Sequence, residues 1–288
     1  MSVPVSIDLP SGYRRVVWPG RLGPIAAVVG GPDAPVGQAL LLPGLTGSKE
    51  DYFAILPDLL AMGWAVAAVD LPGMFESVGT RDPNDFTLQH LVSDVLAMLP
   101  HCSGTPVHLV GHSAGGLIAR HVAVAQPDAL ASLTLYASGC GSVVPEARTN
   151  AVLLRDLLAT TEPAAVHRLK TALDQAAGRP LPAAAIEQFL ARRWAQTAAG
   201  HLMGMADLTL SAPDLLDELA VLSGDGRLPV MALYGEHDNG TWSLSDFAML
   251  GRRAATRTTV IPGAEHSPAV ENPSAMAAAL DEFWRTAT

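Results

Sequence analysis

The sequence predicts an α/β protein with a mostly parallel, doubly wound sheet and an inserted helical cap. Short apolar runs of strand length alternate with longer segments of helical period, which is typical of parallel strands buried under helices on both faces. The alternation stops over residues 139–222, where helical patterns are interrupted by prolines, and then resumes. The length of 288 residues is suitable for one such domain with an insertion.

The elements follow this alternation along the chain. A hairpin of strands 13–18 and 25–29 is expected first, followed by strands 38–42, 65–69, 106–110 and 130–137 with helices 49–62, 86–99 and 113–125 between them. In the insertion the helical patterns cover 152–158, 164–176 and 183–198, and the last part supplies strands 229–234 and 257–261 with helices 243–254 and 273–285. We therefore expect a core domain made of residues 1–138 and 223–288, and a helical lid over 139–222.

The composition of the chain indicates which kinds of binding partner to expect. The formal net charge is -10 and the chain has only two lysines, so a nucleic-acid partner is not expected, because phosphate binding needs clustered basic residues. No apolar run reaches the ~18 residues that a membrane helix needs, and the N-terminal residues lack a basic head followed by an apolar run. Cys102 and Cys140 are expected to be free thiols. These observations predict a cytoplasmic protein, a monomer or homodimer that binds a small-molecule substrate and no membrane.

The segment Gly111-His112-Ser113-Ala114-Gly115 is the strongest sign of chemistry, because it lies between an apolar strand and a helix. A serine on such a sharp turn adopts strained backbone angles, which requires small residues two positions before and after it. The turn lifts the serine hydroxyl above the carboxyl ends of the strands, and the Ala114 amide at the start of the helix faces a developing oxyanion. We therefore expect Ser113 to be a nucleophile.

A serine hydroxyl is a weak nucleophile, so it needs a histidine within hydrogen-bond reach and a third group that orients the histidine. His266 lies in a loop of small and turn-forming residues just beyond the last expected strand. Asp238 follows the strand 229–234 and is the expected acid, with Glu236, two residues earlier, as the alternative. The other histidines lie in an expected strand, on helices or beside these candidates, and packing is the simpler interpretation for them.

The remaining candidates concern the oxyanion and the substrate. After the strand 38–42, the Leu45 amide in the loop Pro43-Gly44-Leu45-Thr46-Gly47 is expected to be the second oxyanion donor. The candidate substrate-binding residues are Thr46, Met74, Phe75, His112 and Met203. The apolar residues of the lid either line an apolar pocket or simply pack the lid onto the body; they are Leu153, Leu154, Leu157, Phe189, Trp194, Leu202, Met203 and Met205.

With nucleophile, acid and histidine in the order Ser113, Asp238, His266, the sequence resembles the α/β-hydrolase superfamily. The resemblance includes the loop Leu42-Pro43-Gly44-Leu45, the turn Asp70-Leu71-Pro72-Gly73, the serine turn, Gly235-Glu236-His237-Asp238 and Gly263-Ala264-Glu265-His266. It implies the α/β-hydrolase fold and a lid inserted where 139–222 lies. Two positions depart from the family pattern: Pro43 stands where many relatives have histidine, and Gly73-Met74-Phe75-Glu76-Ser77 is bulkier than usual. A serine nucleophile argues against the family's haloalkane dehalogenases and epoxide hydrolases.

The expected activity is that of a carboxylesterase, which cleaves a small, largely apolar ester through an acyl-enzyme on Ser113 and needs no metal or cofactor. The same constellation serves lactones, thioesters and carbon–carbon cleavage, so these stay open. A cofactor-free lyase or cyclase, or a non-catalytic ligand-binding receptor, is the alternative from another class.

Overall fold

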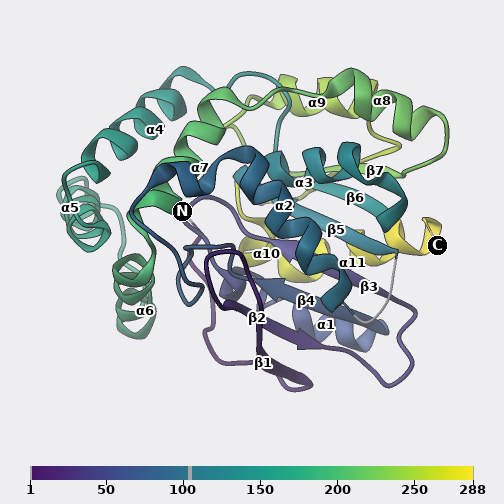
Figure 1. Ribbon diagram of the computed structural model, residues 1–288, viewed down its shortest axis with the longest axis horizontal. Coiled ribbons are helices and arrows are strands. Elements are labelled where there is room, and N and C mark those ends of the chain that lie inside the picture. The colour runs from purple at the N-terminus through teal and green to yellow at the C-terminus, as the bar shows by residue number, and fades with distance from the viewer. Residues whose placement is uncertain (1, 103–105, 288) are drawn as a thin grey trace.

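The computed structural model describes residues 2–102 and 106–287. Within them one eight-stranded sheet crosses the molecule in the order β1-β2-β4-β3-β5-β6-β7-β8 (Figure 1). The strands are β1 (Tyr13–Trp18), β2 (Ile25–Gly30), β3 (Gly37–Leu42), β4 (Trp64–Val69), β5 (Val107–His112), β6 (Leu130–Tyr136), β7 (Val230–Gly235) and β8 (Arg257–Ile261). The β1–β2 hairpin and the β2–β4 pair are antiparallel, and all later pairs are parallel. The predicted fold class and the opening hairpin are confirmed.

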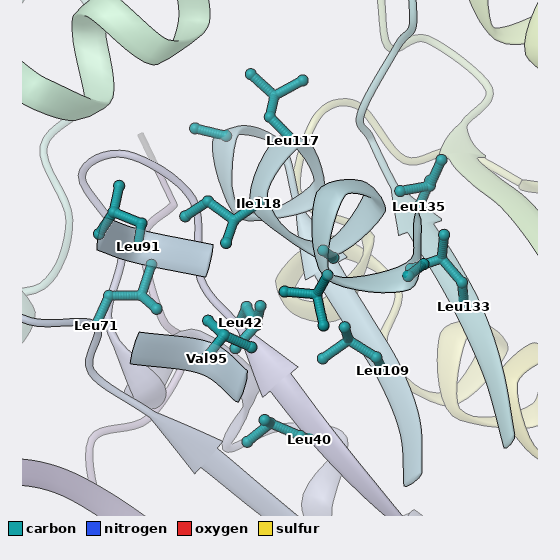
Figure 2. Close-up of a cluster of buried hydrophobic side chains, with 14 of the residues drawn as sticks. Leu40, Leu42, Leu71, Leu91, Val95, Leu109, Leu117, Ile118, Leu133 and Leu135 are labelled. Atoms are coloured by element: carbon teal, nitrogen blue, oxygen red, sulfur yellow. The ribbon is translucent and has the colours of Figure 1, made fainter. Parts of the chain in front are cut away.

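Helices cover both faces of the sheet. Successive side chains of a strand point to opposite faces, and on the central strands the side chains of both faces are apolar. One core joins alternate strand residues such as Leu40, Leu109 and Leu133 to α2 (Leu88–Met98) and α3 (Ala114–Ala125) (Figure 2). The same core also includes residues of α9 (Leu244–Arg253). The other core joins Leu41 and Val110 to α1 (Leu56–Ala61) and α11 (Pro273–Thr286). Each such leucine is almost fully buried and contributes about 2 kcal/mol to folding.

Residues 139–229 are all described and contain five helices between β6 and β7. They are α4 (Pro145–Leu158), α5 (Pro163–Ala176), α6 (Ala184–Gln196), α7 (Ala199–Ser211) and α8 (Leu216–Gly224). α4, α5 and α6 extend beyond one side of the sheet (Figure 1). A small core of their own includes Leu158, Val166, Trp194, Leu202 and Met203. The structure therefore contains helices where the sequence predicts a cap, and their action as a lid stays a prediction.

Some element boundaries differ from the predicted ones. The single helix expected over 49–62 is a 3₁₀ helix, Lys49–Tyr52, followed by α1. Pro57, which lacks an amide hydrogen, lies in the first turn of α1, where no intrahelical donor is needed. α10 (Pro268–Glu271) was too short to predict from periodicity. In the described part of the chain, no helix combines the length and the apolar character needed to cross a membrane.

Candidate active site

The turn between β5 and α3 holds Ser113 in a strained conformation, with φ 51° and ψ -120°. A non-glycine residue rarely adopts a positive φ, and such strain is common at functional sites. Neighbouring glycines make the turn possible, since a Cβ on Gly111 would lie 2.5 Å from the carbonyl oxygen of Gly115. The predicted strain at this serine and the need for small neighbours are therefore confirmed.

Ser113, His266 and Asp238 form one hydrogen-bonded chain. The Oγ atom of Ser113 lies 3.0 Å from Nε2 of His266, and Nδ1 of His266 lies 2.9 Å from Oδ1 of Asp238. The three side chains come from the turn after β5, the loop after β8 and the loop after β7, so the parallel strands bring together residues that are far apart in sequence. Asp238 is buried, whereas 27% of the His266 side chain is exposed. Such a chain can take a proton from the serine hydroxyl while the carboxylate orients the imidazole.

Glu236, the alternative acid, has a different contact. Its Oε2 atom accepts a hydrogen bond of 2.9 Å from the amide of Gly263, and 53% of its side chain is exposed. The described structure thus pairs the imidazole of His266 with Asp238. Five other histidines have partners of their own, as expected for packing residues: His90 with the Asn84 carbonyl, His108 with Ser132, His121 with the Leu117 carbonyl, His201 with the Pro72 carbonyl and His167 with the ring of Trp194.

The loop after β3 lies directly against the serine turn. The amide of Gly47 donates to the carbonyl of Gly44 over 3.0 Å, which makes residues 44–47 a tight turn. A Cβ on Gly44 would lie 3.2 Å from Cβ of Ser113. Leu45 is half-buried in this loop, and Ala114 is the first residue of α3, where amides have no intrahelical acceptor. Donation by the Leu45 and Ala114 amides to an oxyanion beside the serine, at the positive end of α3, stays a prediction.

His112 contacts the loop that contains His266. It is 5% exposed, its ring stacks on Tyr136 at 4.3 Å, and its Nε2 atom donates to the carbonyl oxygen of His266 over 2.8 Å. Burial, with a smaller contribution from nearby His266, lowers the pKa of His112 to about 3, so this ring stays neutral. His112 was predicted to bind substrate, and in the structure it is hydrogen-bonded to the backbone of the 266 loop. Its place beside Ser113 in the sequence was the only sign of this contact.

The other four candidate substrate-binding residues lie in different surroundings. Thr46 is half-buried in the loop beside the serine turn. Met74 has no exposed surface and packs in the same core as Leu40 and Leu109, and its contact with substrate stays a prediction. Phe75 packs edge to face on Phe189, with ring centroids 5.5 Å apart, and Met203 is 9% exposed in the core of the inserted helices. Substrate contact by Thr46, Phe75 and Met203 stays a prediction.

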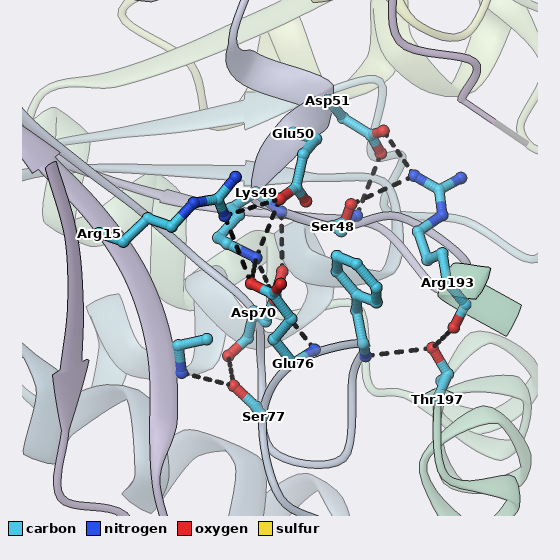
Figure 3. Close-up of polar contacts among 12 residues, drawn as sticks. Arg15, Ser48, Lys49, Glu50, Asp51, Asp70, Glu76, Ser77, Arg193 and Thr197 are labelled. Atoms are coloured by element: carbon cyan, nitrogen blue, oxygen red, sulfur yellow. Dashed lines mark hydrogen bonds and ion pairs between the residues drawn. The ribbon is translucent and has the colours of Figure 1, made fainter. Parts of the chain in front are cut away.

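A cluster of mostly buried charged residues lies next to the loop after β3 (Figure 3). It was not predicted from the sequence. The Nζ atom of Lys49 lies 2.7 Å from Oδ2 of Asp70, 2.7 Å from Oε2 of Glu76 and 3.0 Å from Oε1 of Glu50. Burial alone would lower the pKa of Lys49, but the carboxylates of Asp70 and Glu50 outweigh it and raise that pKa. The backbone amide of Lys49 also donates to Asp70. The sequence shows a lysine and acids near strand ends, but no periodic pattern marks them as buried partners.

The chain is similar to several known proteins. The alpha/beta hydrolase family model matches residues 39–279. A pimeloyl-[acyl-carrier protein] methyl ester esterase of Aeromonas salmonicida is 31% identical over 227 residues, which are 74% of this chain and 82% of that protein. Among solved structures, a hydrolase from Pseudomonas aeruginosa aligns with a TM-score of 0.75 at 19% identity, over 95% of this chain and 99% of its own. An esterase from Thermogutta terrifontis aligns with a TM-score of 0.73 at 21% identity, with the same two coverages.

Proposed function

Because this chain belongs to the alpha/beta hydrolase family, we propose that it cleaves carboxylic esters with Ser113 as the nucleophile, His266 as the acid–base group and Asp238 as the orienting carboxylate. One observation carries the proposal: the hydrogen-bonded chain from the Ser113 hydroxyl through His266 to a buried carboxylate. The strained turn under the serine supports it, because such strain keeps the hydroxyl at the carboxyl edge of the sheet.

The first half of the reaction forms an acyl-enzyme. Nε2 of His266 removes the hydroxyl proton as Oγ of Ser113 forms a bond to the ester carbonyl carbon, and the carbonyl oxygen becomes an oxyanion. The amides of Leu45 and Ala114 donate to that oxyanion. The bond to the alcohol oxygen then breaks, and the imidazolium returns its proton to the departing alcohol.

The second half repeats these steps with water. His266 takes a proton from water, whose oxygen attacks the acyl carbon. The bond to Oγ of Ser113 then breaks, the imidazolium returns its proton to that oxygen, and the carboxylic acid is released. The partly exposed imidazole has access to that water. Proton transfer and hydrogen-bond donation are sufficient for every step, so the proposed mechanism needs no metal or cofactor.

The proposed substrate is a small, largely apolar carboxylic ester. The inserted helices support this choice, because they contain a buried apolar cluster that includes Trp194 and Met203, and we propose that these helices act as a lid over the acyl group. The name of the Aeromonas salmonicida relative supports an acyl methyl ester as one member of this class. Lactones and thioesters are chemically related substrates that the same groups can process.

A fluorophosphonate probe tests the proposal, since it forms a covalent bond only with an activated serine. We expect stoichiometric labelling, located by peptide mass spectrometry on Ser113, and no labelling of the Ser113→Ala variant. Labelling should coincide with loss of hydrolysis of p-nitrophenyl butyrate. Folded protein that hydrolyses this ester but takes up no label at Ser113 would contradict the mechanism, and folded protein with neither property would favour a receptor or a lyase.

A further inference from the structure

Helix α6 of the insertion carries a buried arginine that reaches the body of the protein. Arg193 is 1% exposed, although the adjacent Arg192 on the same helix is exposed. Arginine is rarely fully buried unless its guanidinium has partners, because removing a charge from water is costly. Its guanidinium lies 5.4 Å from the ring centroid of Phe189 on the same helix, but its hydrogen-bond partners in the described part of the chain lie outside the insertion. Figure 3 shows this guanidinium directed at Asp51 and Ser48.

The first set of partners belongs to the loop beside the nucleophile. Nη1 of Arg193 donates to Oδ1 of Asp51 over 2.8 Å and to Oγ of Ser48 over 3.3 Å. The other carboxylate oxygen of Asp51 accepts from the Ser48 amide over 3.3 Å, and a Cβ on Gly47 would lie 2.6 Å from it. Asp51 therefore lies against the end of the tight turn 44–47, whose beginning lies against Ser113.

The second partner leads to the histidine. Nη2 of Arg193 donates to the carbonyl oxygen of Ser2 over 2.9 Å. The hydroxyl of Ser2 lies 2.9 Å from the hydroxyl of Ser267, which directly follows His266 in the chain. Ser2 and Ser267 are both 6% exposed, so this hydrogen bond is shielded from water. One guanidinium thus connects an inserted helix to the two loops that flank the nucleophile.

We propose that Arg193 is a positioning residue: it fixes the 44–51 loop through Asp51 and Ser48, and the 266 loop through Ser2 and Ser267, in the arrangement that ester cleavage requires. The inference rests on the proposed function, because it assigns a purpose to the relative position of those loops. It also explains why a planar guanidinium is suited to this position, since its two Nη atoms serve two separate acceptors at once.

The electrostatics add a consequence for a variant. Burial raises the pKa of Asp51, and the charge and hydrogen bond of Arg193 oppose that effect. Without the guanidinium, Asp51 becomes a buried carboxylate with no cation paired to it, which destabilises the fold. A test must therefore separate a loss of stability from a loss of position.

The test compares Arg193→Met, Asp51→Asn and the double variant for both the free energy of unfolding and the kcat for p-nitrophenyl butyrate. The kcat is expressed per site that a fluorophosphonate labels. Misplacement of reacting groups by about 1 Å costs on the order of 10²-fold in rate, so we expect Arg193→Met to lose about 10- to 100-fold in kcat with little change in KM. The double variant should regain stability, because no unpaired charge is left, but its kcat should stay low.

Two further variants complete the test. Arg155→Met is the matched control, because Arg155 also lies in the insertion but forms an exposed pair with Asp207, and its kcat should equal that of the wild type. Arg193→Lys keeps a cation opposite Asp51 but lacks the two-armed donor, so its kcat should fall several-fold, and this variant decides the matter if Arg193→Met does not fold. Millimolar guanidinium should restore part of the kcat of Arg193→Met.

The outcomes separate this inference from the proposed function. Wild-type kcat in folded Arg193→Met, or a kcat that recovers together with stability in the double variant, would overturn the positioning role and leave the Ser113 mechanism intact. Full activity of Ser113→Ala in the same assay would instead overturn the mechanism itself.

Discussion

Replacing Lys49 by methionine should destabilise the protein severely, because the chain buries this ammonium among three carboxylates. Lys49 is 1% exposed, and its Nζ atom lies within 3.0 Å of Asp70, Glu50 and Glu76. Asp70 and Glu50 are themselves 0% and 2% exposed, so the variant leaves two buried carboxylates without their ammonium partner. Removing one partner of a buried ion pair typically costs about 3–5 kcal/mol, and we expect a loss in this range.

Urea denaturation measures this loss in the free energy of unfolding, and a second lysine of the same chain provides the control. The only other lysine, Lys170, is 45% exposed and pairs with Asp174 one helical turn away, so Lys170→Met should cost less than about 0.5 kcal/mol. The deficit of Lys49→Met should shrink as the pH falls, because protonation neutralises the stranded carboxylates. A deficit below about 1 kcal/mol at neutral pH, or one equal to that of Lys170→Met, would refute the reasoning about buried charge.

Variants at three other positions test the site and its surroundings. Asp238→Asn should keep the fold but lower kcat by about 10⁴-fold, because the amide cannot stabilise the imidazolium, and an unchanged kcat would exclude Asp238 as the orienting acid. His112→Ala should lower kcat, whereas the kcat of His112→Gln should stay near the wild-type value, because glutamine retains a donor for the His266 carbonyl. The pH profile of His112→Gln should be unchanged, because the pKa of His112 is already about 3. Burial lowers the pKa of His201 from 6.5 to about 4, so this residue stabilises the fold fully above pH 6.5 and loses that contribution as the pH falls toward 4. Unfolding free energies should therefore fall by roughly 2 kcal/mol more in the wild type than in His201→Asn between about pH 7.5 and pH 5, and equal slopes would contradict this assignment.

The sheet could be predicted from sequence because its strands are apolar on both faces and short enough to stand out between helices. The strand at Arg257–Ile261 was predicted with its observed bounds, and the antiparallel start of the sheet followed from a short connection between two apolar runs. The helices near residue 50 were harder, because side chains bonded to distant strands, such as Asp70 to the Lys49 amide, decide the local geometry. Helical periodicity contains no information about such contacts.

The candidate site divides in the same way. Ser113 could be predicted because the glycines around it are what a strained strand-to-helix turn requires. Asp238 and His266 each follow the end of a strand, and the parallel topology brings those strand ends together. The contacts of His112 with the 266 loop and of Arg193 with Asp51 depend on side-chain directions across 142 to 154 residues of sequence separation. A single sequence does not encode those directions in any periodic signal, and for that reason these contacts emerged only from the structure.

The proposed mechanism depends on the hydroxyl group of Ser113, and removing that group is its most direct test. Steady-state hydrolysis of a p-nitrophenyl ester by wild type and by folded Ser113→Ala should differ by about 10⁶-fold in kcat, the loss typical of a serine nucleophile. Turnover by the alanine variant at the wild-type rate would contradict the assignment.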